Sequence, residues 1–525
     1  MPTDNLPTPG SLVLVDGKGE SETEIRLSPI PSNDVNDPLR WSWKRKQLAH
    51  LCLVIYTLCT GSSCTLVYSI LIPIEKDTGI PLSTLNAGTG YLFLLLGWGG
   101  LFSQPMALMF GKRGVYLVSM VGGIACLAWN AYVSSKGEWI VNKIIQGFFI
   151  SPIEMLVETS IGDIFYAHER GFYIGVYAFV LFGSNYFAPL VAGFMYEAHG
   201  YRFVFFMGIM IQFVGLVFCF LFMEETNFVR NITELSEAHD DDVSSPAKNA
   251  QNRSSMDEKE AHAEAVELKG TPLRFMEKMK FFNKKYAKTS QLITLVYRPI
   301  WLLRFPVIFW SGFQYGAFLI WYNVLNATAS LILSSPPYNF KASMVGLTYA
   351  GPLVGVSLAA FYSGWFGNKF LLWKAKKSGG VREPEHRLWL LLLCVVFVPS
   401  SLILWGVGAA RQIHWIGLVV GGSLLACSSA VGGAIAINYA LDSYKDLSGE
   451  VMLSIILVRN SLSFGIGYAI TPWLHLGLQN TFVSAAFVGL AITITFIPML
   501  FFGKRFRHFS RKSYWKYVES STLSH

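Results

Sequence analysis

Ionisable side chains within an apolar stretch are the first feature of this sequence that could do chemistry. Residues 138–165 are long enough to cross a bilayer, which takes about 20 helical residues, yet they contain Lys143, Glu154 and Glu158. Steps of three and four residues connect these side chains, so they share one helical face. A carboxylate near mid-membrane costs at least about 2.5–3.5 kcal/mol unless it faces protein or water. The sequence therefore predicts an interior surface for this face to line.

Glu154 is the candidate for binding and releasing a proton. It follows Lys143 by about 16 Å along a helix, and Pro152 is expected to kink the helix just before it. Burial favours its neutral form and a nearby cation favours its charged form. A proton and a cationic substrate would then compete for one carboxylate, which is exchange. Lys143 and Glu158 have a second interpretation, in which they lie near the two membrane surfaces and extend their charges into water.

The elements that must position these residues are membrane helices. Of the 525 residues, 52% are hydrophobic and 14% charged, against about 25% charged in soluble domains. The seven cysteines form no CxxC pair, so neither a disulfide framework nor a zinc site is predicted. We expect no metal and no cofactor. The net charge of +8 comes from loops and tails, so it indicates topology and not a nucleic-acid partner.

Hydropathy predicts an all-α membrane protein with twelve transmembrane helices in two pseudo-symmetric six-helix bundles. The bundles cover residues 47–224 and 298–503. The predicted spans are 47–73, 85–110, 115–135, 138–162, 172–197, 202–224, 301–333, 343–368, 387–409, 413–440, 451–475 and 481–503. The remaining parts are predicted to be a disordered cytoplasmic tail at 1–46, a cytoplasmic linker at 225–297 and a basic cytoplasmic tail at 504–525.

Lysine and arginine are concentrated on the side that carries both termini. By the positive-inside rule this side is the cytoplasm, so we expect a multi-pass protein of the cell membrane with both termini inside. Near 271–290 the linker is predicted to form an amphipathic helix, suited to an anionic inner leaflet or to packing against the bundle.

Several local patterns together resemble the major facilitator superfamily. Within it the chain is similar to the fungal twelve-span drug:proton antiporters, and to their branch related to the histidinol-tolerance (organic-cation and polyamine) permeases. The patterns are Asp37-Pro-Leu-Arg-Trp41, Ile161-Gly-Asp-Ile-Phe165 with His168-Glu-Arg-Gly171, Gly380-Val-Arg-Glu-Pro-Glu-His-Arg-Leu-Trp389, Asp442-Ser-Tyr444, Val458-Arg-Asn460 and Pro472-Trp473. The resemblance implies duplicated halves with a substrate site between them.

One departure from the family pattern concerns the loop after the second span. The family has an acid before Gly111-Lys112-Arg113 that latches one conformation, but this chain has Leu108 there and Asn368 at the equivalent place in the second half. Neutral residues at both places leave that latch without its acid.

Other motif positions carry structural expectations. Lys143 stands where the family has an arginine, and a lysine cannot form a bidentate fork. Pro189 and Gly193 belong to a changed antiporter motif that still permits close helix contact. Asp163 is expected to pair with Arg170 at the cytoplasmic end of its helix, and Asp442 is its echo in the second half.

Two further groups are candidates for the substrate site. Arg459, beside Asn460, is interpreted as a member of a fixed ion pair, a donor to helix carbonyls, an anionic-substrate clamp or a partner of Glu154. Tyr322 and Asn323 belong to a span rich in aromatic and amide side chains. Aromatic side chains with a few amides beside them suit a flat or cationic organic substrate. The alternative is that these aromatic side chains pack within the bundle or at the membrane interface.

The first functional hypothesis is a monomeric proton-coupled exporter of a small organic molecule, a drug or a secondary metabolite, in a fungal membrane. The alternative is an uptake permease for organic cations or polyamines, and the sequence leaves direction and substrate open. An enzyme is not predicted, because the chain has no GxSxG, HExxH or phosphate-binding loop. A transporter-like sensor would carry a long signalling tail, whereas only about twenty residues follow position 505. The expected partners are the substrate, protons and the lipid bilayer.

Overall fold

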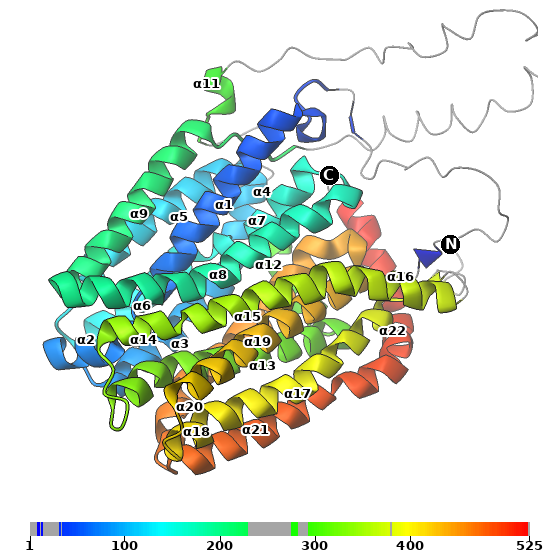
Figure 1. The fold of residues 1–525 in the computed structure, drawn as a ribbon. Coiled ribbons are helices and arrows are strands. Elements are labelled where there is room, and N and C mark those ends of the chain that lie inside the picture. Colours follow the sequence, from blue (N-terminus) through cyan, green and yellow to red (C-terminus); the bar gives the residue numbers. More distant parts are fainter. Residues whose placement is uncertain are drawn as a thin grey trace, which may run out of the picture.

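The computed structural model describes residues 8–10, 12–13, 31–32, 34–228, 275–281, 292–378 and 381–522, and these are almost entirely helical (Figure 1). Most of the predicted tail at 1–46 and of the linker at 225–297 lies outside the described residues. Of the amphipathic helix expected near 271–290, the structure describes a single turn, α11 (Phe275–Lys278).

Eleven helical stretches in the described residues are long and apolar enough to cross a membrane. A further helix of 19 residues, α5 (Lys112–Asn130), packs against α6 and α9. Its first turn carries Lys112 and Arg113, which make it less apolar than the others. With α5 the described part of the chain has the twelve membrane helices that the sequence predicts.

The N-terminal half of the molecule comprises α1 to α9. Its helices are α1 (Trp43–Thr65), α2 (Leu71–Thr78), α3 (Leu82–Trp98), α4 (Gly100–Phe110), α5, α6 (Lys136–Ile150), α7 (Pro152–Ile164), α8 (Ala167–His199) and α9 (Tyr201–Phe222). The short 3-10 helices η1 (Pro38–Arg40) and η2 (Tyr68–Ile70) precede α1 and α2.

The C-terminal half comprises α12 to α22. Its helices are α12 (Leu292–Leu302), α13 (Pro306–Ser334), α14 (Ala342–Thr348), α15 (Ala350–Phe361), α16 (Gly367–Lys377), α17 (Leu392–Leu402), α18 (Gly408–Ala410), α19 (Trp415–Ser443), α20 (Ser448–Leu474), α21 (Leu478–Ile494) and α22 (Phe496–Thr522). The π-helical turns η5 (Tyr362–Phe366) and η7 (Ile403–Val407) and the 3-10 helices η6 (Pro384–Leu391) and η8 (Lys445–Leu447) complete it. Because α22 is continuous, the residues expected as a tail from 504 are helical to Thr522.

The predicted break at Pro152 is confirmed. Helix α6 ends at Ile150 and α7 begins at Pro152, whose ring cannot continue the preceding hydrogen-bond ladder. The break places Glu154 in the first turn of α7. The positive end of the helix dipole favours a carboxylate at that position.

The two halves meet along a seam made by α3 with α20 and by α8 with α14 and α15 (Figure 1). Glycines permit the close approach. A Cβ on Gly467 of α20 would lie 2.9 Å from the Cα of Gly90 on α3, and one on Gly346 of α14 would lie 3.3 Å from the Cα of Gly193 on α8. The seam is also bridged by Ser343 N–H, which donates to Glu197 Oε1 at 2.9 Å. We call the end of the molecule that carries Ser343 and Glu197 the far end. We call the opposite end, where α1 begins and α22 ends, the tail end.

A short N-terminal segment lies against the tail end of the C-terminal half. Strand β1 (Leu12–Val13) pairs antiparallel with β2 (Val381–Arg382), the two strands of the described residues. The buried Arg507 of α22 donates to the Pro9 carbonyl at 2.5 Å. This pairing is a small departure from the predicted all-helical chain.

Candidate functional site

An ion pair joins the two halves inside the bundle. Arg459 of α20 donates through an Nη atom to Glu154 Oε2 on α7. The two side chains are 2% and 7% exposed, respectively. Among the interpretations that the sequence left open for Arg459, this contact fits both a fixed ion pair and a partner of Glu154. Burying two charges is costly and is offset here by close pairing and further hydrogen bonds.

The groups that hold Arg459 otherwise belong to its own half. Asn460 Oδ1 accepts from the Nε and an Nη of Arg459 at 3.0 and 2.8 Å. Tyr315 OH on α13 accepts from the other Nη at 2.9 Å, and the Tyr315 ring lies 4.7 Å from the guanidinium carbon. Gly433 of α19 makes room for that ring, because a Cβ there would lie 2.6 Å from it. Arg459 is therefore positioned even without Glu154.

Glu154 is bound on one side only. Its Oε2 accepts from Arg459 and, at 3.3 Å, from Asn460 Nδ2. Within the described residues its Oε1 accepts no hydrogen bond. One helical turn closer to the tail end, Glu158 is half-buried and, among the described residues, has no ion-pair partner. One oxygen atom of the Glu154 carboxylate is thus left without a hydrogen bond from the described residues.

Lys143 is buried and does not extend to a membrane surface, in contrast to one interpretation of the sequence. Its Nζ donates to Gln146 Oε1 at 3.0 Å and lies 4.6 Å from the centre of the Trp139 ring. Gln146 in turn donates to the Ser63 carbonyl at 3.2 Å. No carboxylate of the described residues pairs with Lys143. The structure therefore does not bring Lys143 together with Glu154.

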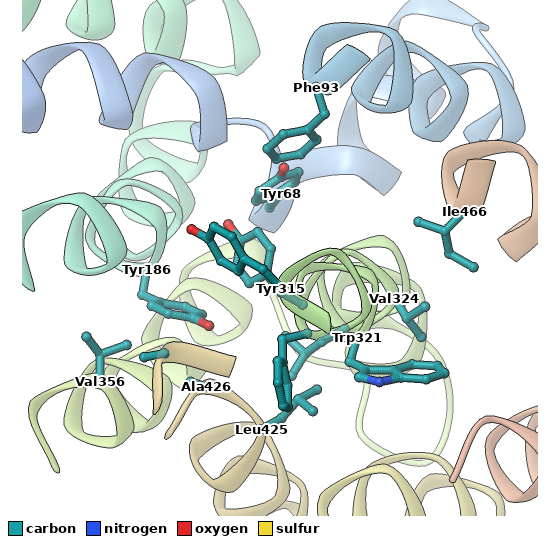
Figure 2. Packing of buried hydrophobic residues seen from close by; sticks show 14 of the residues in the cluster. Tyr68, Phe93, Tyr186, Tyr315, Trp321, Val324, Val356, Leu425, Ala426 and Ile466 are labelled. Carbon is teal, nitrogen blue, oxygen red and sulfur yellow. The ribbon is translucent and has the colours of Figure 1, made fainter. Parts of the chain in front are cut away.

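Tyr322 and Asn323 lie on α13 on the far-end side of this network. Both belong to a group of tyrosines and amides where η2, α8, α13 and α14 meet. The Tyr322 ring contacts the rings of Tyr68 and Tyr186 at 6.2 and 5.6 Å between centroids. Figure 2 shows Tyr68 and Tyr186, which come from different elements, near Tyr315 of α13.

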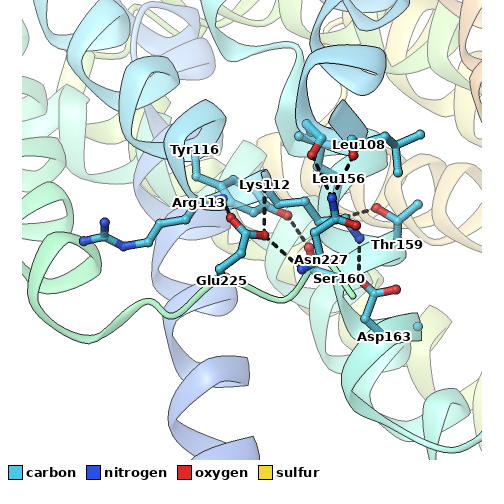
Figure 3. Close-up of polar contacts among 12 residues, drawn as sticks. Leu108, Lys112, Arg113, Tyr116, Leu156, Thr159, Ser160, Asp163, Glu225 and Asn227 are labelled. Carbon is cyan, nitrogen blue, oxygen red and sulfur yellow. Dashed lines mark hydrogen bonds and ion pairs between the residues drawn. The ribbon is translucent and has the colours of Figure 1, made fainter. Parts of the chain in front are cut away.

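A second polar cluster lies at the tail end of the N-terminal half (Figure 3). Lys112 Nζ lies 2.5 Å from Asp163 Oδ2. The carboxylate of Glu225, just after α9, accepts from the backbone N–H groups of Lys112 and Arg113 at 2.9 and 3.1 Å. Asn227 closes the cluster by donating to the Leu108 carbonyl at 2.8 Å. An acid from the exit of α9 therefore occupies the loop in which the sequence shows Leu108 where the family has an acid.

Burial raises the pKa of Glu225 above its usual value. The backbone N–H groups of Lys112, Arg113 and Asn227, which donate to its carboxylate, oppose the shift. Gly111 has φ +107°, and a Cβ there would meet the Glu225 carboxylate. The glycine is therefore required both by the backbone conformation and by the close approach of the acid.

Several motif residues make contacts that the sequence did not indicate. Asp163 pairs with Lys112, and Arg170 donates to the carbonyls of Phe165 and Gly162. Arg170 lies at the start of α8 and folds back over the end of α7. The expected pair of Asp163 with Arg170 stays a prediction. In the C-terminal half, Asp442 pairs with Arg387 at 2.9 Å. These two acid–base pairs lie at the tail ends of their respective halves.

Arg113 holds the exit of α9 to the linker. It donates to the carbonyls of Phe220 and Met223 at 2.8 and 2.7 Å and to that of Met279. In α8, Pro189 lies inside the helix and Gly193 faces α14, so close helix contact is preserved without a Gly-Gly pair.

Sequence reasoning missed Glu225 and did not single out Tyr315. Glu225 follows Glu224 directly after a long apolar span, and two adjacent acids at that place are the signal that could have found it. Nothing distinguishes Tyr315 in sequence from the other aromatic residues of its span, because its role depends on the approach of α20 and α19. The described residues contain no cluster of metal-ligating side chains.

A molecule of two membrane-embedded halves, joined by a buried ion pair, has the architecture of a carrier that exposes an internal site to each side in turn. The Major Facilitator Superfamily model matches residues 53–376. The chain belongs to this family and is a multi-pass membrane transporter. This agrees with the expectation that it is not an enzyme.

Three similar proteins illustrate the range of the family. Protein HOL1 of Saccharomyces cerevisiae is 26% identical over 94% of this chain and 92% of its own length. The efflux pump FUBT of Fusarium oxysporum is 22% identical over 93% of this chain and 77% of its own length. The fold is also that of the Escherichia coli xylose transporter XylE in a partially occluded inward-open conformation. That structure aligns with 86% of this chain and 97% of its own at a TM-score of 0.55 and 11% identity.

Proposed function

We propose that the protein is a proton-coupled secondary transporter that exports a small organic molecule, a drug or a secondary metabolite, and that Glu154 carries the coupled proton. The observation that carries this proposal is the buried Glu154–Arg459 pair, whose two members belong to different halves. Because the pair crosses the seam, a proton that binds Glu154 weakens a contact between the two halves. The similarity to an efflux pump supports export.

The mechanism follows from the uneven environment of the pair. Protonation at Oε1 removes the charge of Glu154 and leaves Arg459 with Asn460 and Tyr315, which belong to its own half. The arginine therefore needs no new partner when the halves part. Loss of the proton restores the attraction and draws α7 and α20 together again. Substrate bound between the halves is released when this exchange turns the site toward the other side.

A second candidate function is uptake of an organic cation or polyamine. The favouring observation is Glu158, a half-buried carboxylate without an ion-pair partner among the described residues. Such a group attracts a cation into the space beside α7. Under either function we place the protein in the cell membrane, as a monomer with both termini in the cytoplasm. Membership of the drug:proton antiporter branch is part of the same proposal.

The experiment is transport in sealed proteoliposomes that contain the purified protein and a pH-sensitive dye. Rhodamine 6G, a cation, and labelled 2-naphthamide, which is uncharged, serve as the export probes, and labelled spermidine serves as the uptake probe. Counterflow gives the direction of movement. Glu154→Gln is expected to abolish proton movement and to flatten the pH dependence of transport. Asp77→Asn, at an exposed acid of α2, is the matched control and is expected to behave like the wild type. Unchanged pH dependence in Glu154→Gln would end the proposal.

A further inference from the structure

The buried polar atoms of α13 include several without a hydrogen-bond partner. Asn326 is 1% exposed, and neither its Nδ2 nor its Oδ1 is hydrogen-bonded. Asn323 Oδ1 is unpartnered as well. In the N-terminal half Tyr68 OH is buried in the same state, and Tyr349 OH at the end of α14 is another. Each such atom costs about 1–3 kcal/mol, so a group of them calls for an explanation.

The tyrosines of this region, Tyr186 and Tyr322 included, pack in one cluster where the two halves meet, and Tyr68 and Asn323 also line a small cleft there. We call this group of residues beside the cleft the tyrosine–asparagine chamber. Its residues are Tyr68, Tyr186, Tyr322, Asn323, Asn326 and Tyr349. The rings of Tyr186 and Tyr349 lie 6.4 Å apart and those of Tyr186 and Tyr322 lie 5.6 Å apart, the latter edge to face. Tyr68 and Tyr186 come from different elements, η2 and α8 (Figure 2). Tyr68 and Tyr186 belong to the N-terminal half and the other four residues to the C-terminal half.

The chamber lies at the level expected for a transported molecule. Along α13, Tyr315 contacts Arg459, Asn323 follows about 12 Å farther on, and Ser330 accepts from Ile72 N–H of the N-terminal half at 3.4 Å. The chamber therefore lies between the Glu154–Arg459 pair and the contacts that close the far end. A small cleft lined by Tyr68, Asn86, Thr89, Asn323 and Ser463, among others, adjoins it.

The lining carries hydrogen-bonding groups and ring faces but no charge. Neither the chamber nor the residues that line the cleft include Asp, Glu, Lys, Arg or His within the described residues. The charge of Glu154 is compensated by Arg459. A charged group moved into this space would lose its hydration without gaining a counter-ion. An uncharged flat molecule would replace ring–ring contacts with its own ring and would satisfy the unpartnered atoms.

We infer that the tyrosine–asparagine chamber is a substrate-binding site for an uncharged, flat organic molecule that carries both hydrogen-bond donors and acceptors. The inference rests on the proposed transport function and narrows its substrate class. Tyr186 and Tyr322 supply ring surface. The amide of Asn326 supplies one donor and one acceptor. Because the two halves share the chamber, opening of the far end divides it and releases the molecule.

The experiment is ligand-induced thermal stabilisation of the purified protein without a proton gradient. The probes are 2-naphthamide, 2-naphthoate and 2-naphthylmethylammonium, which share one ring system and differ in charge. We expect 2-naphthamide to raise the Tm and the two charged probes to leave it unchanged. Asn326→Leu is expected to unfold no lower than the wild type without probe, since an apolar group replaces an unsatisfied one, and to lose the naphthamide shift. Asn480→Leu, at an exposed asparagine of α21, is the control and should keep the shift.

Three results of the binding experiment overturn the inference, and transport measurements separate its failure from that of the proton coupling. A charged probe that stabilises as strongly as the amide, or a shift that survives Asn326→Leu, excludes this chamber or this ligand class. An Asn326→Leu protein that is destabilised and insensitive to all three probes means that ordered water satisfies the amide. The binding experiment involves no protons. If no probe binds but transport still depends on pH, the chamber is rejected as the substrate site and the proton coupling is retained. If 2-naphthamide binds but the pH dependence of transport is unchanged in Glu154→Gln, the proton coupling is rejected and the chamber is retained.

Discussion

Arg459 holds Glu154 through a single carboxylate oxygen, and both residues are almost fully buried. The other groups around the guanidinium, Asn460 and Tyr315, come from the half of the molecule that carries the arginine. The pair is therefore unequal. The arginine is positioned whether or not the acid is present, whereas Glu154 relies on the opposite half for every hydrogen bond that the structure gives its carboxylate.

This inequality predicts how the pair contributes to stability. Glu154→Leu removes the counter-ion and leaves a buried cation, which typically costs about 3–5 kcal/mol. Glu154→Leu combined with Arg459→Met replaces the pair with apolar groups of similar size and is expected to recover most of that loss. Thermal unfolding of the purified variants in detergent is the measurement. If the single variant is as stable as the double one, Asn460 and Tyr315 compensate the charge of Arg459 by themselves.

The glycine contacts of the seam predict a variant that opens the far end. In Gly467→Ala the new Cβ would lie 2.9 Å from Gly90 Cα and 3.3 Å from the Asn86 carbonyl, so α3 and α20 must separate. Gly465→Ala on the same helix is the matched control, because nothing lies within 4 Å of the added atom. Both changes carry the same gain in helix propensity.

Labelling of a cysteine placed at the buried Ser330 by a polar maleimide reports the opening. The seven native cysteines are all buried and give a low background. We expect faster labelling in Gly467→Ala than in Gly465→Ala and the wild type. Equal rates in all three proteins would show that α3 and α20 tolerate the methyl group without parting.

The membrane helices could be predicted from the sequence because each depends on a local property, a run of apolar residues of sufficient length. The break at Pro152 is equally local. Glu154 could be found in the same way, because a carboxylate in such a run needs an interior. The identity of its partner was only one of several options, since Arg459 is 305 residues away and the seam that joins them is a property of the fold.

The contacts that the sequence did not reveal have one physical origin, which is that their partners come from distant parts of the chain. Asp163 was expected to pair with Arg170, which is close to it in sequence, and nothing in the sequence indicated that Lys112 reaches it from another helix at 2.5 Å. The missing acid at Leu108 was correctly noticed, but the replacement, Glu225, lies after α9 and joins the loop only through folding. The chamber depends on four elements from both halves, and its unpartnered atoms have no counterpart in a hydropathy pattern.

Glu225 predicts a pH dependence of stability. Burial raises the pKa of its carboxyl group, so the folded protein binds a proton more tightly than the unfolded chain. In the pH window above the ordinary glutamate value and up to the raised one, the folded state holds more protons, and stability therefore falls as pH rises. Glu225→Gln cannot titrate at this position. The Tm of the wild type should therefore fall relative to the Tm of this variant as pH increases through the window. Thermal unfolding of both proteins at a series of pH values is the measurement.

The alternative outcome is equally informative, because opposing contributions act on Glu225. Its carboxylate accepts from the backbone N–H groups of Lys112, Arg113 and Asn227, and these bonds favour the charged form. If the advantage of the wild type over Glu225→Gln grows with pH, these hydrogen bonds outweigh burial and Glu225 acts as a charged cap on α5. Glu277→Gln, at an exposed acid of α11, controls for the loss of one surface carboxylate. It is expected to show the same pH profile of stability as the wild type.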